Sequence, residues 1–342
     1  MLVLKLLLLS LVITRVSAGI GFRVGLIDTP AGRKQHQGSV ALTGGIAIFL
    51  TILAGTYLFK IQPYTYPMLW VAAAIFLVGI FDDLKHIRAS VRLGISFMSG
   101  VALATLGGIV IVNVGNLLAM GDIPLLWLSV PLTALAVAGL SNACNMIDGI
   151  DGLAAGSFAL PLLVLYLLAL QAGHPMAPAL LLMLVPLAVF LCFNLGPNNK
   201  WMPKIFLGDA GSVTLGFLLT ASLVYFSQGE RAIILPVTAL WLVTVPLMDM
   251  LATMLRRHRL GTGIMRADRL HVHHTLMALG LESRQTLSVL LAYASACAML
   301  GLALERIPEY LSLLLYFLLF CGHCVFVLKA GSVKRGRVSP SG

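Results

Sequence analysis

Residues 142–156 read NACNMIDGIDGLAAG and lie between two apolar runs, at 123–141 and 153–171. Each run is long enough to cross a bilayer as a helix. The acids and amides between the runs would be costly inside the hydrocarbon, where polar side chains persist mainly at functional sites. The stretch therefore predicts two membrane-spanning helices joined by a polar turn at the membrane surface.

The polar residues of this turn are spaced for binding. At helical spacing, Asn142, Asn145 and Asp148 lie on one face at the end of the first helix. Gly149 and Gly152 let the chain turn and bring its backbone close to a ligand. The glycines do not match the spacing of an EF-hand calcium loop. A plain loop is the alternative, but it does not need two amides aligned behind two acids.

The rest of the chain is also apolar. Of its 342 residues, 59% are hydrophobic and only 11% are charged, and the mean hydropathy is +0.97. Apolar runs near twenty residues recur, which indicates an all-α, multi-pass membrane protein. We expect one transmembrane domain over residues 1–328 and a basic tail over residues 329–342. The expected spans, about eleven, lie near residues 1–20, 40–60, 66–82, 93–112, 123–141, 153–171, 177–195, 212–228, 232–254, 286–304 and 309–328.

The first run has a second interpretation. Val16-Ser-Ala18 resembles the cleavage site of a signal peptide. However, Lys5 alone makes a weak basic N-region, and Arg15 interrupts the run just before that site. We therefore favour a retained first helix.

Basic residues predict the orientation in the membrane. If the N-terminus faces outside, the outward connections keep only Lys60, Arg231 and Arg306. The inward segments then hold Arg23, Arg33, Lys34, Lys85, Arg88, Arg92, Lys200, Lys204, Arg256, Arg257, Arg259, Arg266, Arg269, Arg284, Lys329, Lys334, Arg335 and Arg337. This asymmetry follows the positive-inside rule and predicts a cytoplasmic C-terminus. It also accounts for the net charge of +10 without a nucleic-acid partner.

The aspartates gather on the same side, although the positive-inside rule says little about acids. Only Asp122 falls outside, and Asp249 falls within the ninth span. The other seven of the nine aspartates fall on the inward side: Asp28, Asp82, Asp83, Asp148, Asp151, Asp209 and Asp268. A polyanionic substrate bridged by a metal ion explains this better than coincidence.

Two of these acids end the third span in the sequence FDDL, at residues 81–84. Adjacent acids at a helix C-terminus oppose the helix dipole and each other. Asp82 and Asp83 are either a solvated pair neutralised by Lys85 or a site for a divalent cation or an ionised base.

The eighth span opens with FLGDAGS, at residues 206–212. Asp209 or Ser212 would serve as a helix N-cap. The same geometry is also a phosphate-binding site, in which Asp209 holds a magnesium ion against the phosphate.

The longest inward connection carries three histidines, His271, His273 and His274, after Arg266. Zinc is one interpretation, but no cysteine or acid completes a familiar ligand spacing. The many arginines nearby would repel a cation and attract a diphosphate. We therefore favour an anion site.

Together these motifs resemble the polyprenyl-phosphate N-acetylhexosamine-1-phosphate transferases, glycosyltransferase family 4. The resemblance covers most of the chain: GLIDTPAGRKQHQG and TGG within 25–45, FDDLK at 81–85, NACNMIDGIDGL at 142–153, FLGDAGS at 206–212 and DRLHVHH at 268–274. Residues 238–250 and the histidine motif most resemble the bacterial members that use UDP-N-acetylglucosamine and undecaprenyl phosphate. Val272 interrupts a run of three histidines seen in other members, and Ala41 replaces a proline common in the first loop.

The resemblance implies a reaction. The phosphate of undecaprenyl phosphate attacks the β-phosphorus of a UDP-sugar, most simply UDP-N-acetylglucosamine, and UMP leaves. It implies Mg²⁺, with Mn²⁺ as a substitute, held by Asp209 and Asn145. Asp82 and Asp83 would act with Asp209 in catalysis, by orienting the lipid phosphate or keeping it deprotonated. The substrate-binding residues it implies are Asp148, Asp151 and Phe206 for uridine, Arg266, His271, His273 and His274 for the diphosphate and sugar, and Lys34 in the first loop.

The expected location is the bacterial inner membrane, with the active site on the cytoplasmic face and a product that feeds a cell-envelope glycan such as O-antigen. A homo-oligomer is compatible with the sequence. The alternatives are another UDP-sugar, such as UDP-N-acetylfucosamine or the muramoyl-pentapeptide donor, a secondary transporter, or an inactive scaffold.

The ninth span carries two unusual residues. Pro246 predicts a kink or break, and the resemblance implies a bent helix beside a lipid groove. Asp249 is either a functional residue or the partner of a nearby basic group.

Overall fold

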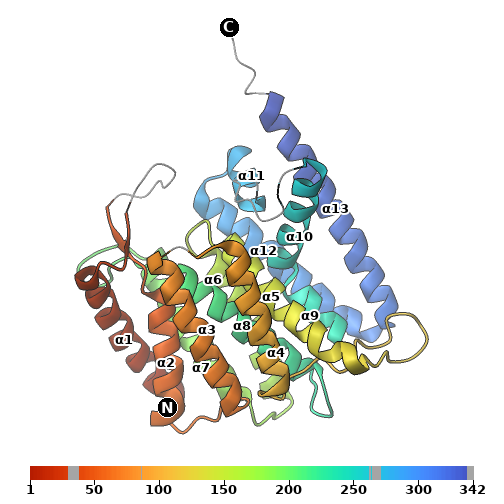
Figure 1. The fold of residues 1–342 in the computed structure, drawn as a ribbon, viewed down its shortest axis with the longest axis horizontal. Coiled ribbons are helices and arrows are strands. Elements are labelled where there is room, and N and C mark those ends of the chain that lie inside the picture. Colours follow the sequence, from red (N-terminus) through yellow and green to blue (C-terminus); the bar gives the residue numbers. More distant parts are fainter. Residues whose placement is uncertain (30–37, 86, 262, 264–270, 337–342) are drawn as a thin grey trace.

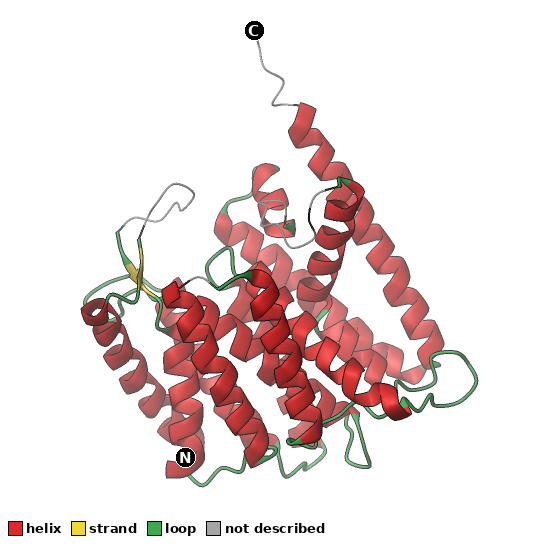
Figure 2. Ribbon diagram, in the orientation of Figure 1, coloured by secondary structure: helices red, strands yellow, loops and turns green. Residues whose placement is uncertain are grey.

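The computed structural model describes residues 1–29, 38–85, 87–261, 263 and 271–336. Helices dominate this part of the chain, and they pack side by side as a bundle (Figures 1 and 2). The helices are α1 (Leu2–Val24), α2 (Gly44–Leu58), α3 (Tyr66–Lys85), α4 (Ala89–Thr105), α5 (Ser129–Ile147), α6 (Leu153–Gln171), α7 (Ala177–Leu195), α8 (Gly208–Ser227), α9 (Pro236–Leu242), α10 (Thr244–Arg259), α11 (Val272–Ala278), α12 (Ser283–Ala303) and α13 (Glu309–Gly336), with short 3₁₀ turns η1 (Leu126–Leu128) and η2 (Leu304–Arg306). The expected α-helical membrane protein is confirmed at this level.

Eight helices in the described part of the chain are long and apolar enough to cross a membrane. The bent pair α9 and α10 would make a ninth crossing. Two shorter apolar helices, α2 and α4, cover the remaining two segments that the hydropathy predicted. Each of the eleven predicted spans thus coincides with a helix or with the bent helix pair. In the described part of the chain, however, only eight helices, or nine crossings if the bent pair counts as one, are long and apolar enough to cross a membrane.

One small departure from the all-α prediction is a two-stranded sheet. Strand β1 (Ile27–Asp28) pairs antiparallel with β2 (Val40–Ala41). Beyond β2, the backbone N–H of Phe206 donates to the carbonyl of Ala41, and the N–H of Gly44 donates to the carbonyl of Phe206, both at 2.9 Å. The strands therefore connect the ends of the first loop to the segment before α8. Lys34 lies outside the described residues.

Helix α8 is the centre of the bundle. It packs against α2, α3, α5 and α6, and 94% of its apolar stretch is buried. Small residues allow this close packing: a side chain at Gly216 would meet the backbone of Ser141, and one at Gly79 would meet the backbone of Ala210. Because α8 is held on all sides, its first turn is a rigid support for Asp209.

The ninth predicted span is broken. Helices α9 and α10 differ in direction by 80°, with the break at Val243. Pro246 lacks an N–H and its ring conflicts with the carbonyl four residues earlier, at Leu242, which is the last residue of α9. The predicted kink is confirmed, and the chain bends just before the proline.

Candidate functional site

The site forms where α8 begins. The carboxylate of Asp83, at the end of α3, accepts hydrogen bonds from the backbone N–H groups of Asp209 (2.7 Å) and Ala210 (3.1 Å). These N–H groups belong to the first turn, which has no helical acceptor for them. Asp83 therefore caps α8 from another helix, and neither Asp209 nor Ser212 provides the cap.

Asn145 joins the motif at 142–153 to the motif at 206–212. Its amide Nδ2 donates to Oδ1 of Asp209, and it lies 3.1 Å from the hydroxyl of Ser212. Asn145 belongs to the last turns of α5, and Asp209 to the first turn of α8. The packing of α5 against α8 thus brings together two residues 64 positions apart in the chain.

Arg92, in the first turns of α4, is a site residue that sequence reasoning placed only among the inward charges. Its guanidinium Nη1 lies 2.9 Å from Oδ2 of Asp82 and 3.6 Å from Oδ2 of Asp209. Asp82 is only 2% exposed and also accepts from the N–H of Ile87 at 2.7 Å. The sequence feature that could have identified Arg92 is its place as a cation at the very start of an apolar span, ten residues after Asp82.

The residues predicted to bind uridine also come together. Lys204 Nζ pairs with Oδ2 of Asp151 and lies 5.5 Å from the centre of the Phe206 ring. Asp148 interacts electrostatically with Asp209, Asp151 and Asp83. Lys204 is a second residue that the motifs had not singled out.

The histidine segment covers the turn that follows α5, at residues 148–152. His273 is fully buried, and a side chain at Gly149 would meet its Nε2 at 2.3 Å, so the glycine provides the space for this ring. The neighbouring rings of His271 and His274 have centroids 5.9 and 4.2 Å from that of His273. Gly152 has φ of 77°, as expected for a turn glycine.

His273 is held neutral. Desolvation, and then the charge of His274, lower the pKa of its imidazole to about 3. Among the described residues, neither ring nitrogen has a hydrogen-bond partner. A buried imidazole with both nitrogens unsatisfied is costly, and a ligand that bonds to it would remove that cost.

The oxygen donors here suit magnesium. Mg²⁺ in proteins takes one or two carboxylates, keeps several waters and binds substrate phosphates. Asp209 supplies a carboxylate, and the Asn145 side chain contacts it through its amide nitrogen, which leaves the amide oxygen for another ligand. Burial, and then the charges of Asp209, Asp151 and Asp83, raise the pKa of the nearby Asp148 carboxyl to about 7. In the part of the chain that the structure describes, no three His, Cys, Asp or Glu side chains form a closed metal cage.

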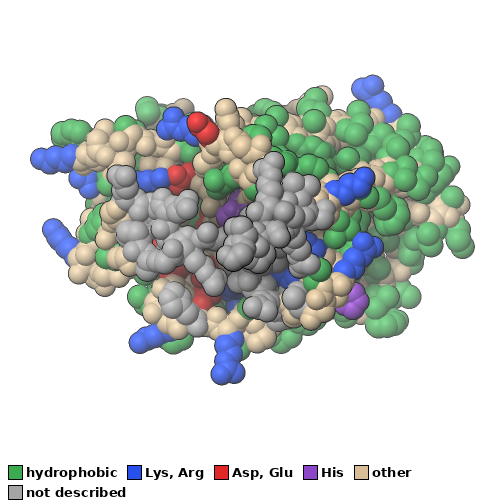
Figure 3. All heavy atoms as spheres, turned by 90° about the horizontal axis from the view of Figure 1, so that it is seen from above, with side chains coloured by type: hydrophobic (Ala, Val, Ile, Leu, Met, Phe, Trp, Pro, Cys, Tyr) green, Lys and Arg blue, Asp and Glu red, His purple; other side chains and the backbone are tan. Residues whose placement is uncertain are grey.

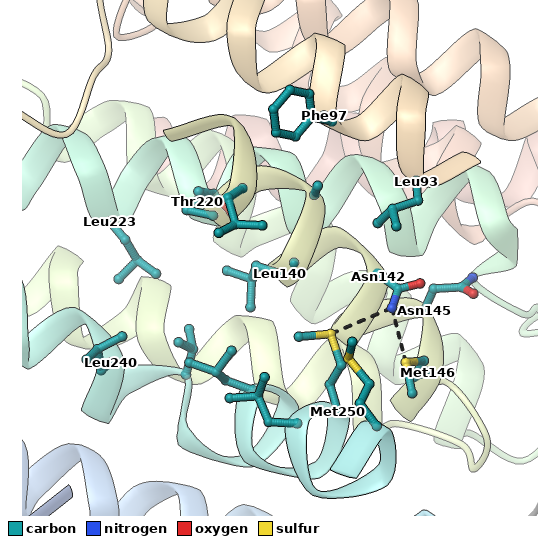
Figure 4. Close-up of a pocket in the computed structure, with 18 of the residues that line it drawn as sticks. Leu93, Phe97, Leu140, Asn142, Asn145, Met146, Thr220, Leu223, Leu240 and Met250 are labelled. Carbon is teal, nitrogen blue, oxygen red and sulfur yellow. Dashed lines mark hydrogen bonds between the residues drawn. The ribbon is translucent and has the colours of Figure 1, made fainter. Parts of the chain in front are cut away.

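A groove with a volume of about 1290 Å³ leads away from this cluster. Arg92, Asn145 and His273 line its polar end, and Figure 4 shows Asn142 and Asn145 there. The rest is largely apolar, with walls from α4, α5, α8, α9 and α10, including Phe97 and Leu240. The break between α9 and α10 lies along this groove, because Val243 is one of its lining residues.

Viewed from the end that carries the site, the molecule shows Lys and Arg around the rim, with acidic and histidine side chains between them (Figure 3). Of the predicted site residues, the structure brings together Asp82, Asp83, Asn145, Asp148, Asp151, Phe206, Asp209, His271, His273 and His274. Arg266, like Lys34, lies outside the described residues.

Fold and site define a class: multi-pass α-helical membrane proteins with an acid- and histidine-lined site at one end of the bundle, open to an apolar groove. The family model described as Glycosyl transferase family 4 matches residues 65–227. The chain is 34% identical over 327 residues to the undecaprenyl-phosphate alpha-N-acetylglucosaminyl 1-phosphate transferase of Yersinia pestis, covering 93% of this chain and 89% of that protein. Proteins of the same name from Escherichia coli K12 (34% over 316 residues, 89% of this chain and 84% of that protein) and Haemophilus influenzae (33% over 321 residues, 91% and 89%) are similar as well.

The chain belongs to glycosyl transferase family 4. The family predicted from five short motifs is thereby confirmed.

Proposed function

We propose that the chain transfers N-acetylglucosamine 1-phosphate from UDP-N-acetylglucosamine to undecaprenyl phosphate and releases UMP. The names of its relatives support this donor and acceptor. The observation that carries the proposal is the meeting of Asp83, Asn145 and Asp209 at the polar end of an apolar groove. That arrangement suits a lipid phosphate and a nucleotide diphosphate that react at the membrane surface.

The groove accommodates the polyprenyl chain, and its polar end receives the phosphate. Arg92 is a cation at that end, and its pairing with Asp82 fixes the guanidinium beside Asp209. A free phosphate has its second pKa near 6, so the attacking oxygen is ionised at neutral pH without a strong base. Asp82 and Asp83 therefore act mainly by holding Arg92 and the first turn of α8 in place.

The nucleotide lies on the other side of Asp209. Phe206 stacks on the uracil, and Asp148 and Asp151 accept hydrogen bonds from the uridine. Lys204, 5.5 Å from the Phe206 ring, adds a positive charge beside the nucleotide phosphate. The neutral ring of His273 contacts the diphosphate or the sugar and so satisfies its buried nitrogens.

Asp209 and Asn145 would hold Mg²⁺, for which Mn²⁺ can substitute. The ion supplies a charge that offsets the repulsion between two anionic reactants. In the reaction, an oxygen of the lipid phosphate forms a bond to the β-phosphorus while the bond from that phosphorus to the bridging oxygen breaks. The departing oxygen belongs to UMP.

The proposed topology has eleven crossings, with the N-terminus outside and the site at the cytoplasmic face of the bacterial inner membrane. The start of α1 and the end of α13 lie at opposite ends of the bundle, and basic residues surround the site (Figures 1 and 3). Residues 1–328 form the transferase domain, and residues 329–342 form the tail. The product initiates a cell-envelope glycan such as O-antigen.

The test is a panel of UDP-sugars presented to the purified protein with undecaprenyl phosphate. UDP-N-acetylglucosamine should give the highest kcat/KM. A preference for UDP-N-acetylfucosamine or the muramoyl-pentapeptide donor would retain the chemistry and replace the sugar. Uptake of a substrate into proteoliposomes without UMP release would indicate a transporter instead.

A further inference from the structure

Asp249 is a buried acid for which the proposed reaction has no direct use. It lies on α10, has no solvent-exposed surface, and makes two hydrogen bonds to the histidine segment. Its Oδ1 accepts from the backbone N–H of Val272 at 2.7 Å, and its Oδ2 lies 2.8 Å from Nδ1 of His271. One carboxylate thus holds both the backbone and a side chain of the segment that covers Gly149.

These contacts define the tautomer of His271. An ionised carboxylate can only accept hydrogen bonds, so Nδ1 of His271 carries the hydrogen. The remaining ring nitrogen, Nε2, is then the one available to a ligand, and His271 lines the groove at its polar end. An amide in place of the carboxylate can donate to Nδ1 and would favour the opposite tautomer.

The contacts continue beyond His271. Its ring lies parallel to that of His273, with an interplanar angle of 5°, and His273 in turn rests on Gly149. Other residues of α10, including Leu247, Met250 and Met254, line the lipid groove. Asp249 therefore connects α10, which lines the lipid groove, to the histidines that we place beside the diphosphate and sugar.

We propose that Asp249 is a positioning residue: it holds His271 with its hydrogen on Nδ1 and thereby places the histidine segment 271–274 over Gly149. The proposal rests on the transferase function proposed above. If Asp249 only stabilised the fold, turnover would not depend on which ring nitrogen of His271 carries the hydrogen. If Asp249 positions His271, turnover depends on that tautomer.

Asp249→Asn tests this, because asparagine has nearly the same volume and its Oδ1 can still accept from Val272. We expect kcat to fall by about 100-fold or more, as reversed tautomers do in comparable Asp–His pairs, and KM for UDP-N-acetylglucosamine to change by less than about 3-fold. The melting temperature and the binding of UMP should stay close to those of the unsubstituted protein. Thr253→Val is the matched control, because Thr253 is equally buried one turn later on α10 and its hydroxyl has no hydrogen-bond partner in the described part of the chain.

His271→Ala and the double variant show whether Asp249 acts through His271. His271→Ala should lose turnover while retaining UMP binding, and adding Asp249→Asn should change its rate by less than about 2-fold. The proposal would be overturned if the loss of kcat in the double variant equalled the product of the two single losses. Normal turnover in Asp249→Asn or in His271→Ala would overturn it as well.

The tautomer can also be measured without turnover. The NMR spectrum of protein with ¹⁵N-labelled histidine should show the signal of an imidazole protonated at Nδ1. This signal should disappear in His271→Ala and should be replaced by that of an Nε2-protonated imidazole in Asp249→Asn. An unchanged spectrum in Asp249→Asn would refute the positioning role. Absence of UMP release from the unsubstituted protein would instead refute the transferase proposal, while this spectrum still decides the role of Asp249.

Discussion

At the scale of single residues, the site depends on side chains that reach across helices. Asp83 caps α8, Asn145 contacts Asp209, and Asp249 holds His271. The sequence predicted that Asp83 and Asp209 share one side of the membrane, because sidedness follows from the order of spans, and it placed Asp249 within the ninth span. It did not predict the pairings, since which helix end lies beside which depends on packing between distant segments.

Asp209→Asn should abolish magnesium-dependent UMP release, with a loss of at least about 1,000-fold, because the substitution removes the negative charge that Asp209 would offer to the cation. The backbone N–H of residue 209 still donates to Asp83, so the melting temperature should change little. Asp122→Asn, an exposed acid away from the site, is the control. Full activity in Asp209→Asn would reject the assignment of Asp209 as metal ligand.

His273 also predicts a pH dependence of stability. Its pKa is about 3 in the folded protein against an ordinary 6.5, so the unfolded chain binds a proton more readily. The stability is therefore fully present above pH 6.5 and decreases as the pH falls from there toward 3. Between pH 7.5 and 5.5, the melting temperature should fall less in His273→Gln than in the unsubstituted protein; an equal fall would show that His273 is not a buried neutral group.

His273→Ala should weaken transfer more than it weakens the binding of uridine. The residue lies over Gly149, while the uridine-binding residues cluster around Lys204 and Phe206. Titration of UMP into the variant, alongside its turnover rate, checks this. An equal loss of UMP affinity would place His273 with the nucleoside instead.

At the scale of elements, the break between α9 and α10 shapes the groove. Pro246 made a kink predictable, but its 80° size did not follow from the sequence, because the two helices pack against different partners: α9 mainly against α12, and α10 against α5, α12 and α13. The two-stranded sheet was not predicted, because two-residue strands have no periodic pattern. Hydropathy also did not distinguish α2 and α4 from the eight helices that are long enough to cross a membrane.

Gly139 offers a way to fill the groove. It lies on α5 in the groove wall, and the nearest atom to an added Cβ would be the methyl of Met250 at 3.9 Å. Gly139→Leu should raise KM for undecaprenyl phosphate by about 10-fold and leave KM for UDP-N-acetylglucosamine unchanged, because it occupies space that only the lipid uses. Gly139→Ala, which fits without displacement, should behave like the unsubstituted protein; a larger KM for the nucleotide sugar in Gly139→Leu would contradict the division of the site.

At the scale of the whole molecule, the sequence-predicted site residues in the described part of the chain lie together, and the groove extends from them between the helices. The positive-inside rule predicted the site to be cytoplasmic. Hydropathy and charge suffice for such a prediction because a bilayer constrains every span in the same way. The groove itself could not be predicted, because its walls come from five helices.

Orientation can be tested by introducing one cysteine at a time into a variant without the exposed Cys192 and Cys321, since the other three cysteines are buried. Trp201 lies in the loop before α8 at the site end, Trp127 precedes α5 at the other end, and both are more than three-quarters exposed. In intact cells, a membrane-impermeant maleimide should label Trp127→Cys and not Trp201→Cys. The reverse pattern would invert the proposed topology.

The most direct test of the proposed reaction is to identify both products made by the purified protein from UDP-N-acetylglucosamine and undecaprenyl phosphate in the presence of Mg²⁺. The account predicts UMP and undecaprenyl-diphosphate N-acetylglucosamine in equal amounts, and neither product when the lipid is omitted. Release of UDP in place of UMP, or no lipid-linked sugar at all, would contradict it.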